Sequence, residues 1–141
     1  KDYDRVMDAG ASSKNIYFIR YADLILLYAE CLLAENDLAG AKQQVIRVRN
    51  RAKVSTPITA SNNTEMLDFI YEERMRELGM EGWRRMDLIR RGADYFAAQV
   101  DKYNPFAKGN VQPYHAFYPI PTNEINMNDG IGAEDQNEGY K

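Results

Sequence analysis

The sequence predicts a mainly α-helical fold that consists of a tetratricopeptide-like helical pair, further helices and a long ordered C-terminal loop region. Apolar residues recur at steps of three and four in successive segments up to Ile89, which is the spacing of one face of a helix. From Asn104 onward, prolines and glycines interrupt the chain at short intervals, which is typical of irregular structure. A chain of 141 residues suits one domain with a core of its own, so we expect residues 1–141 to form a single helical domain.

The first helix is expected over residues 20–35, after a polar, turn-rich loop at residues 1–15. Its apolar residues cover nearly the whole circumference, which predicts burial on most sides. The stripe at helical spacing comprises Ala22, Ile25, Leu26, Ala29, Leu32 and Leu33. Cys31 lies beside this stripe and is expected to be a buried, inert thiol; as the single cysteine, it also excludes an internal disulfide.

The second helix is expected over residues 38–52, where apolar residues are again spaced by three and four. They are Leu38, Ala41, Val45, Val48 and Ala52. Asn36 and Asp37 leave only a short turn between the two helices, which predicts an antiparallel pair like one tetratricopeptide unit. Because a lone helical pair leaves its outer faces uncovered, further repeats are expected beside it, outside this chain.

An arginine-rich segment follows a loop at residues 54–63, and its helix is expected to start at Thr64. Residues 72–92 contain six arginines, five carboxylates and no lysine. Arginine alone is favoured where a planar, always-charged group pairs bidentately with a carboxylate in a partly dry place. This choice of cation favours a buried ion-pair network over the alternative, an ordinary amphipathic helix with a solvated charged face.

The predicted structural ion-pair network consists of residues that share one face if the helix runs unbroken. They are Arg74, Glu77, Glu81, Arg84 and Asp87, with Arg91 at the next step. The apolar stripe beside them comprises Leu67, Tyr71, Met75, Leu78, Met86 and Ile89. Arg20, Arg49 and Arg51, on the first two helices, are the candidate cross-helix partners. Gly92 ends the segment, and residues 93–103 are expected to add one short helix before the tail.

Composition and motifs exclude several classes of function. A net charge of −3 and a sequence pI of about 5.2 argue against a general nucleic-acid binder. The sequence lacks an apolar run of about 18 residues that would span a membrane. It also lacks a Gly-rich phosphate loop, a Ser/His/Asp or Cys/His set and a metal-ligand cluster, so no catalytic residues, metal or cofactor are expected.

Three carboxylates at a spacing of four, Glu73, Glu77 and Glu81, could suggest a glycosidase pair or a carboxylate metal site. Glu77 and Glu81 each have an arginine three residues away, which favours the charged carboxylate over the protonated form that a general acid needs. We therefore expect structural pairing rather than catalysis at these positions.

Sugar recognition requires flat aromatic surfaces with planar polar groups beside them. Tyr103 and Tyr114 are the candidate carbohydrate-binding residues, and Phe117 and Tyr118 are further aromatics of the same tail. The alternative is that these rings pack the loop against the helices, which is the commoner role of loop aromatics. Trp83, which follows Gly82, is expected to be a packing residue.

Five motifs in a fixed order resemble the C-terminal part of the SusD/RagB family. They lie at residues 19–30, at residues 48–52, at residues 73–90, at residues 118–125 around Pro119-Ile120-Pro121, and at residues 136–140, which begin Gln136-Asn137. The chain departs from the family pattern at three positions: Ile46, Lys53 and Glu138 stand where the family often has Asn, Gly and Pro. These departures affect local turns.

The resemblance implies a surface lipoprotein of the outer membrane that is built on tetratricopeptide-like helix pairs and does no chemistry. Such proteins bind glycans or other nutrients and pass them to a TonB-dependent β-barrel transporter of the SusC type. The chain would be about the last third of such a protein, and its only membrane attachment would be an N-terminal lipid that lies outside this chain. The alternatives are a freestanding tetratricopeptide-like adaptor for protein partners and, more distantly, a carbohydrate-active enzyme.

Overall fold

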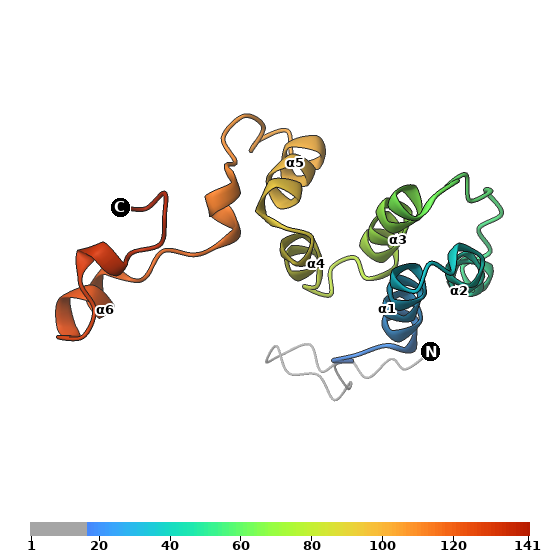
Figure 1. Ribbon diagram of the computed structural model, residues 1–141, viewed down its shortest axis with the longest axis horizontal. Helices are drawn as coiled ribbons and strands as arrows, with labels where there is room; N and C mark the ends of the chain where they lie inside the picture. Colours follow the sequence, from blue (N-terminus) through green and yellow to red (C-terminus); the bar gives the residue numbers. More distant parts are fainter. Residues whose placement is uncertain (1–16) are drawn as a thin grey trace, which may run out of the picture. The chain divides into compact units, whose positions relative to one another are not determined.

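The computed structural model describes residues 17–141, in which α-helices and short 3₁₀ helices are present and no strand occurs (Figure 1). The mainly α-helical class predicted from the sequence is confirmed. The chain divides into two compact units, Lys1–Glu77 and Leu78–Lys141, and each is described by itself. The loop expected at residues 1–15 lies outside the described residues, and the single-domain organisation stays a prediction.

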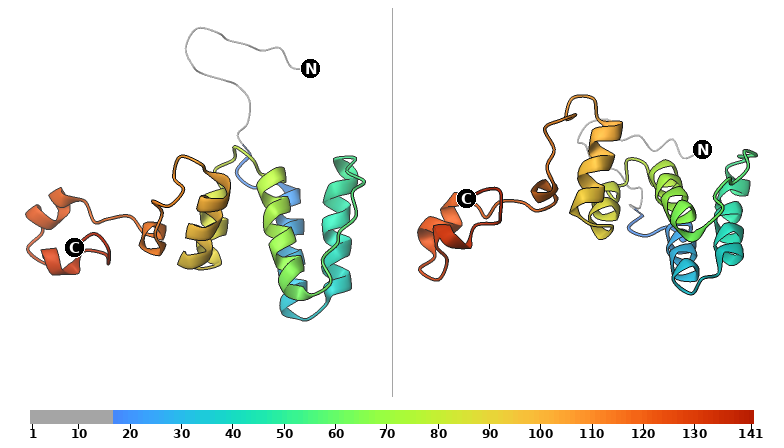
Figure 2. Two further views of the ribbon diagram at one scale, coloured as in Figure 1. Left: turned by 90° about the horizontal axis from the view of Figure 1, so that it is seen from above. Right: turned by 45° about the horizontal axis from the view of Figure 1, so that its top comes forward.

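Three helices form the first unit: α1 (Tyr21–Ala34), α2 (Leu38–Arg51) and α3 (Asn63–Glu77). α1 and α2 run antiparallel, and α3 packs against both of them (Figure 2). The helical pair at residues 20–52 is therefore present, while its tetratricopeptide-like character stays a prediction. Within residues 17–141, no helix is both long and apolar enough to cross a membrane.

Polar caps set the ends of these helices. The chain leaves α1 through Asn36, which has a positive φ of 64°, and Asp37 begins α2 by accepting a hydrogen bond from Gly40 N at 2.8 Å. The side chain of Asn62 accepts a hydrogen bond from Glu65 N at 2.9 Å and so caps α3. α3 therefore begins one residue before the predicted Thr64, with a different residue as its cap.

The core of the first unit combines the apolar stripes of its three helices. Its fully buried members are Leu26, Ala29, Ala41, Val45, Met66 and Ile70. Ala29 and Ala41, with their small side chains, are fully buried in this core, which allows α1 and α2 to pack closely. This core fixes the three helices whose charged side chains are described below.

The expectation that α1 is buried on most sides is wrong for the described residues. Tyr21, Leu24 and Tyr28 are each at least half exposed, and Cys31 is exposed rather than buried. The reason is that α2 and α3 cover one side of α1 only, while these residues lie at steps of three and four on the other side.

The arginine-rich segment is not one helix, contrary to expectation. α3 ends at Glu77, and the next helix of the second unit, α4 (Arg84–Arg90), begins only after a connection at residues 78–83. Met80 and Gly82 in this connection have positive φ values of 67° and 83°, which a right-handed helix cannot contain. Met86, predicted in the apolar stripe, is exposed in consequence.

The second unit continues with α5 (Ala93–Tyr103), the 3₁₀ helix η1 (Pro113–Ala116), α6 (Thr122–Met127) and the 3₁₀ helix η2 (Ala133–Asp135). Leu88, Phe96 and Ala116 form its small buried core. The short helix at residues 93–103 was predicted from the sequence, whereas α6 and the two 3₁₀ helices were not.

Side-chain amides hold the C-terminal tail in place. Gln136 accepts a hydrogen bond from Ile120 N at 2.8 Å and donates one to Ile120 O at 3.0 Å. Asn137 Nδ2 donates to Tyr118 O at 2.7 Å, and the Tyr140 hydroxyl donates to Phe117 O at 3.1 Å. The last two sequence motifs thus bind each other, which explains why a tail with little regular structure is ordered.

Candidate functional site

A buried ion pair joins α1 to α3 in the first unit. Arg74 Nη1 lies 2.7 Å from Asp23 Oδ1, and the two side chains are only 3% and 6% exposed. Glu30, two turns further along the same face of α1, lies 4.0 Å from Arg74 Nε. Charges this deeply buried are tolerated only when they are paired, so the contact fixes how α3 lies against α1.

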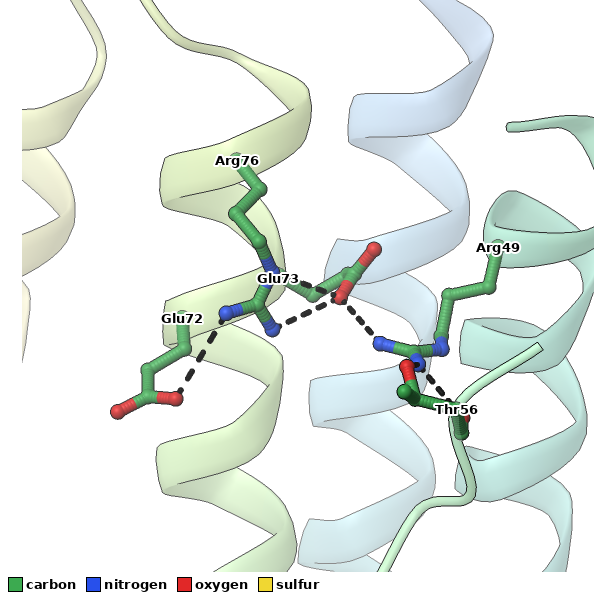
Figure 3. Close-up of polar contacts among 5 residues, drawn as sticks. All are labelled: Arg49, Thr56, Glu72, Glu73 and Arg76. Atoms are coloured by element: carbon green, nitrogen blue, oxygen red, sulfur yellow. Dashed lines mark hydrogen bonds and ion pairs between the residues drawn. The ribbon is translucent and has the colours of Figure 1, made fainter. Parts of the chain in front are cut away.

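A second ion-pair group centres on Glu73, between α2 and α3 (Figure 3). Glu73 Oε2 accepts hydrogen bonds from Arg49 Nη1 at 3.0 Å and from Arg76 Nη2 at 2.9 Å. Arg49 also donates to the backbone carbonyl of Thr56 at 2.6 Å, which ties the loop after α2 to the same group. The Arg49 guanidinium lies 5.2 Å from the centroid of the Phe69 ring, a distance typical of a cation–π contact.

A third ion-pair group centres on Glu77. Its Oε1 accepts hydrogen bonds from Arg20 Nη1 at 2.7 Å and from Arg51 Nη2 at 2.6 Å. The Glu77 side chain is 7% exposed, whereas that of Arg51 is 64% exposed. Each of the three arginines named from the first two helices as cross-helix partners therefore pairs with a carboxylate of α3.

The structure does not place the five predicted network residues on one helix face, because the helix ends at Glu77. Arg74 and Glu77 bind α1 and α2 in the first unit, whereas Asp87 is buried in the second unit and pairs with Arg90 Nη2 at 3.2 Å. Glu81 is exposed in the connection and Arg84 is half-buried at the start of α4. Their membership of a network stays a prediction.

The predicted ion-pair network left out two of the buried carboxylates, Asp23 and Glu73. Asp23 stands alone among apolar residues of α1, and a lone carboxylate on an apolar helix is the signal that could have found it. Glu73 was considered only with Glu77 and Glu81, as one of three carboxylates at a spacing of four. Both are identified by tertiary packing and not by their neighbours in sequence.

A cavity of 660 Å³ lies in the second unit, within the range of about 300–1,000 Å³ that is usual for ligand pockets. The start of α5, η1 with its flanks, and the C-terminal segment surround it. The lining residues are Ala93, Gln112, Pro113, Tyr114, Phe117, Asn137, Glu138 and Gly139. It therefore combines two aromatic rings with two side-chain amides and one carboxylate.

The two candidate carbohydrate-binding residues have different surroundings. Tyr114 lines the cavity, and its ring packs against Tyr140, with 5.2 Å between centroids, and against Gly139. Tyr103 lies at the end of α5, outside this lining, with Lys102 Nζ 4.8 Å from its ring centroid. Phe117, which was considered only as a further aromatic of the tail, lines the cavity and is 58% exposed.

Trp83 and the single histidine, His115, lie outside the lining of the cavity. Trp83 is half-buried in the connection before α4, not inside a helix. His115 Nδ1 accepts a hydrogen bond from Gln112 N at 2.9 Å and so helps to shape η1. Among residues 17–141, no group of three or more His, Cys, Asp or Glu side chains is arranged to hold a metal ion.

Comparison with known proteins gives a consistent result. The chain is 34% identical over 134 residues to a SusD-like protein of Formosa agariphila, which covers 92% of this chain and 25% of the relative. It is 32% identical over 133 residues to the starch-binding protein SusD of Bacteroides thetaiotaomicron, which covers 90% of this chain and 22% of that relative. The chain thus spans about a quarter of the length of these curated relatives.

No solved structure gives a significant match to this chain. The SusD family model matches residues 1–140, which is nearly the whole chain and includes the five motifs singled out in the sequence. The predicted family resemblance is therefore confirmed, and the chain belongs to the SusD family.

Proposed function

We propose that this chain is part of a cell-surface protein that captures glycans and hands them to a TonB-dependent β-barrel transporter of the SusC type. The family match over residues 1–140 is the observation that carries this proposal, and a relative named as starch-binding supports glycans as the ligand class. The protein would lie on the outer face of the outer membrane, held by an N-terminal lipid.

Binding without catalysis is favoured by the chemistry of the carboxylates. Glu73, Glu77 and Asp87 each contact at least one arginine at 3.2 Å or less. These carboxylates are engaged in ion pairs, whereas glycoside hydrolysis needs two carboxyl groups that face the glycosidic bond from either side. These side chains therefore serve to hold helices together, and the protein is a binding protein rather than an enzyme.

A protein-interaction adaptor is the second candidate function. The observation that favours it is the exposed row of Tyr21, Leu24 and Tyr28 on α1, because apolar side chains that gather on one helix face mark interaction surfaces. An adaptor of this kind would bind protein partners and show no affinity for sugars.

A glycan array followed by calorimetric titration of each positive glycan tests the proposal. The protein should be used with any sequence that flanks residues 1–141 in the cell. We expect saturable binding of at least one glycan class and no release of reducing ends. Turnover that Glu77→Gln abolishes would overturn the assignment as a binding protein.

Handover is tested separately by extraction from outer membranes with mild detergent. Co-purification with a β-barrel transporter is the expected result. Absence of glycan binding together with absence of a β-barrel partner would favour the adaptor instead.

A further inference from the structure

The cavity of the second unit has an aromatic wall that is fixed in place and open to solvent. The Phe117 carbonyl accepts a hydrogen bond from the Tyr140 hydroxyl at 3.1 Å, and the preceding carbonyl, of Ala116, accepts one from Arg85 Nη2 at 3.1 Å. The backbone of Phe117 is thus held on both sides while its ring stays 58% exposed. An aromatic ring held in this way can bind a flat apolar surface without a large loss of side-chain freedom.

Polar side chains lie beside this ring on the same cavity wall. Asn137, which lines the cavity, donates a hydrogen bond from its Nδ2 to Tyr118 O at 2.7 Å, which orients the amide and leaves its Oδ1 able to accept another. Gln112 supplies a second amide, and Glu138 supplies a carboxylate. Vicinal hydroxyl groups of a sugar both donate and accept hydrogen bonds, so a carboxylate with two amides matches them, while the C–H face of the sugar matches the ring.

The charge of the lining sets a limit on the ligand. The eight lining residues include one carboxylate, Glu138, and no lysine or arginine. The arginine that contacts this loop, Arg85, is directed elsewhere, since it binds backbone carbonyls and lies 4.3 Å from the centroid of the Tyr118 ring. Glu138 is therefore the charged residue of this lining.

From this arrangement we infer that the cavity is an oligosaccharide subsite that accepts uncharged sugars and rejects sugars that carry sulfate or carboxylate groups. The inference deepens the proposed glycan-binding function and rests on it. An anionic substituent near Glu138 meets a like charge, with no cation in the lining to offset it. In water-accessible surroundings, we expect the repulsion to weaken binding by about five-fold or more.

The test is calorimetric titration with two sets of hexasaccharides. One set is neutral (glucose, galactose and mannose oligomers), and the other is anionic (oligogalacturonate and sulfated galactan). Phe117→Ala is compared with Phe106→Ala, a matched control whose ring is 95% exposed and outside the cavity lining. We expect Phe117→Ala to weaken binding of the neutral ligand about ten-fold or more. Phe106→Ala is expected to change it less than two-fold.

A second variant, Glu138→Gln, tests whether the carboxylate of the lining rejects anionic sugars. Glu138→Gln keeps the shape of the side chain and removes the charge, so it should raise the affinity for anionic oligomers about five-fold relative to neutral ones. A parent protein that prefers anionic oligomers would overturn the inference. So would an unchanged ratio of affinities in Glu138→Gln.

The outcomes separate this inference from the function on which it rests. If glycan binding persists equally in Phe117→Ala and Phe106→Ala, the protein binds sugars elsewhere, and only the subsite is wrong. If the parent binds no glycan, both fail. NMR shifts of the Asn137 and Gly139 amides during titration of the parent give a readout that does not depend on a variant's folding, and unmoved amides at saturation would also refute the subsite.

Discussion

Removing one charge of the buried pair between α1 and α3 should destabilise the first unit strongly. Asp23→Asn keeps the size of the side chain but leaves the Arg74 guanidinium, 3% exposed, without its partner at 2.7 Å. Breaking a buried pair by removing one partner costs roughly 3–5 kcal/mol. Because Glu30 remains 4.0 Å from Arg74 Nε, we expect a loss near the lower limit, about 3 kcal/mol of unfolding free energy.

Urea unfolding followed by far-UV circular dichroism measures this loss. Fluorescence would not report the pair directly, since the single tryptophan, Trp83, lies in the other unit. Glu35→Gln is the matched control, because it also neutralises a carboxylate, but an exposed one at the end of α1. Its effect should stay within about 0.5 kcal/mol.

A double variant separates the value of the pair from the cost of a stranded charge. Asp23→Leu combined with Arg74→Met replaces both charges by apolar groups and should recover most of the stability lost in Asp23→Asn. If Asp23→Asn unfolds at the same urea concentration as Glu35→Gln, the pair contributes nothing, and the reasoning from its burial is wrong.

Two further predictions concern the acid limb of stability and the C-terminal tail. The Ser61 amide and then the Ser61 hydroxyl, both bonded to the Glu65 carboxylate, lower the pKa of Glu65 from its ordinary value of 4.5. The contribution of the Glu65 carboxylate to stability is therefore present above pH 4.5 and is lost as the pH falls through the lower folded-state pKa. Glu65→Gln should thus be less stable than the parent at neutral pH, and the two proteins should become equally stable in acid. Urea midpoints measured across an acid titration test this, and a difference between the midpoints of the two proteins that stays constant with pH would contradict it. Gly139 has a φ of 84°, and an added Cβ would lie 2.3 Å from the Tyr114 ring, so Gly139→Ala should cost about 1–3 kcal/mol and expose the tail amides to hydrogen exchange. Gly109→Ala is the control, since Gly109 has a φ of 79° with open space around it, and equal effects of the two substitutions would show that backbone strain rather than the ring contact is responsible.

The fold class and the family could be predicted from the sequence because they depend on local patterns. The stripe of α2 is an example: its spacing placed Ala41, Val45 and Val48 in the core, where they are found. The preference for arginine also indicated ion pairs in a dry environment, and such pairs are present at Arg49 and Arg74. In both cases the signal comes from residue types within one segment.

The break after α3 could not be predicted with the same certainty, because glycine alone does not end a helix. Gly79 and Gly82 lie in this connection, but the decisive conformations include the positive φ of Met80, which no residue preference indicates. The partner of Arg74 was missed for a related reason: Asp23 meets Arg74 only after the chain has folded back on itself. The exposed thiol of Cys31 depends likewise on which side of α1 its neighbours cover.

The cavity shows most clearly what could not be predicted from the sequence. Tyr114 was a candidate because tyrosine is suited to sugar binding, yet Asn137 and Glu138 reach the same cavity only because Gln136 binds Ile120 and turns the tail back. The sequence showed the two segments that meet here, residues 118–125 and 136–140, only as separate motifs. The return of the chain, which joins them, is a property of the tertiary structure.

The ion pairs of the first unit also bear on how long its folded state lasts. Arg74 meets Asp23 and Arg20 meets Glu77 across sequence separations of 51 and 57 residues. Because such distant contacts need α3 to be docked, we expect them to form after the folding transition state. Interactions that are absent from the transition state slow unfolding and leave the folding rate nearly unchanged. Stopped-flow measurements of Asp23→Asn should therefore show a higher unfolding rate and an unchanged folding rate. These ion pairs would then chiefly slow the unfolding that exposes the chain to proteases.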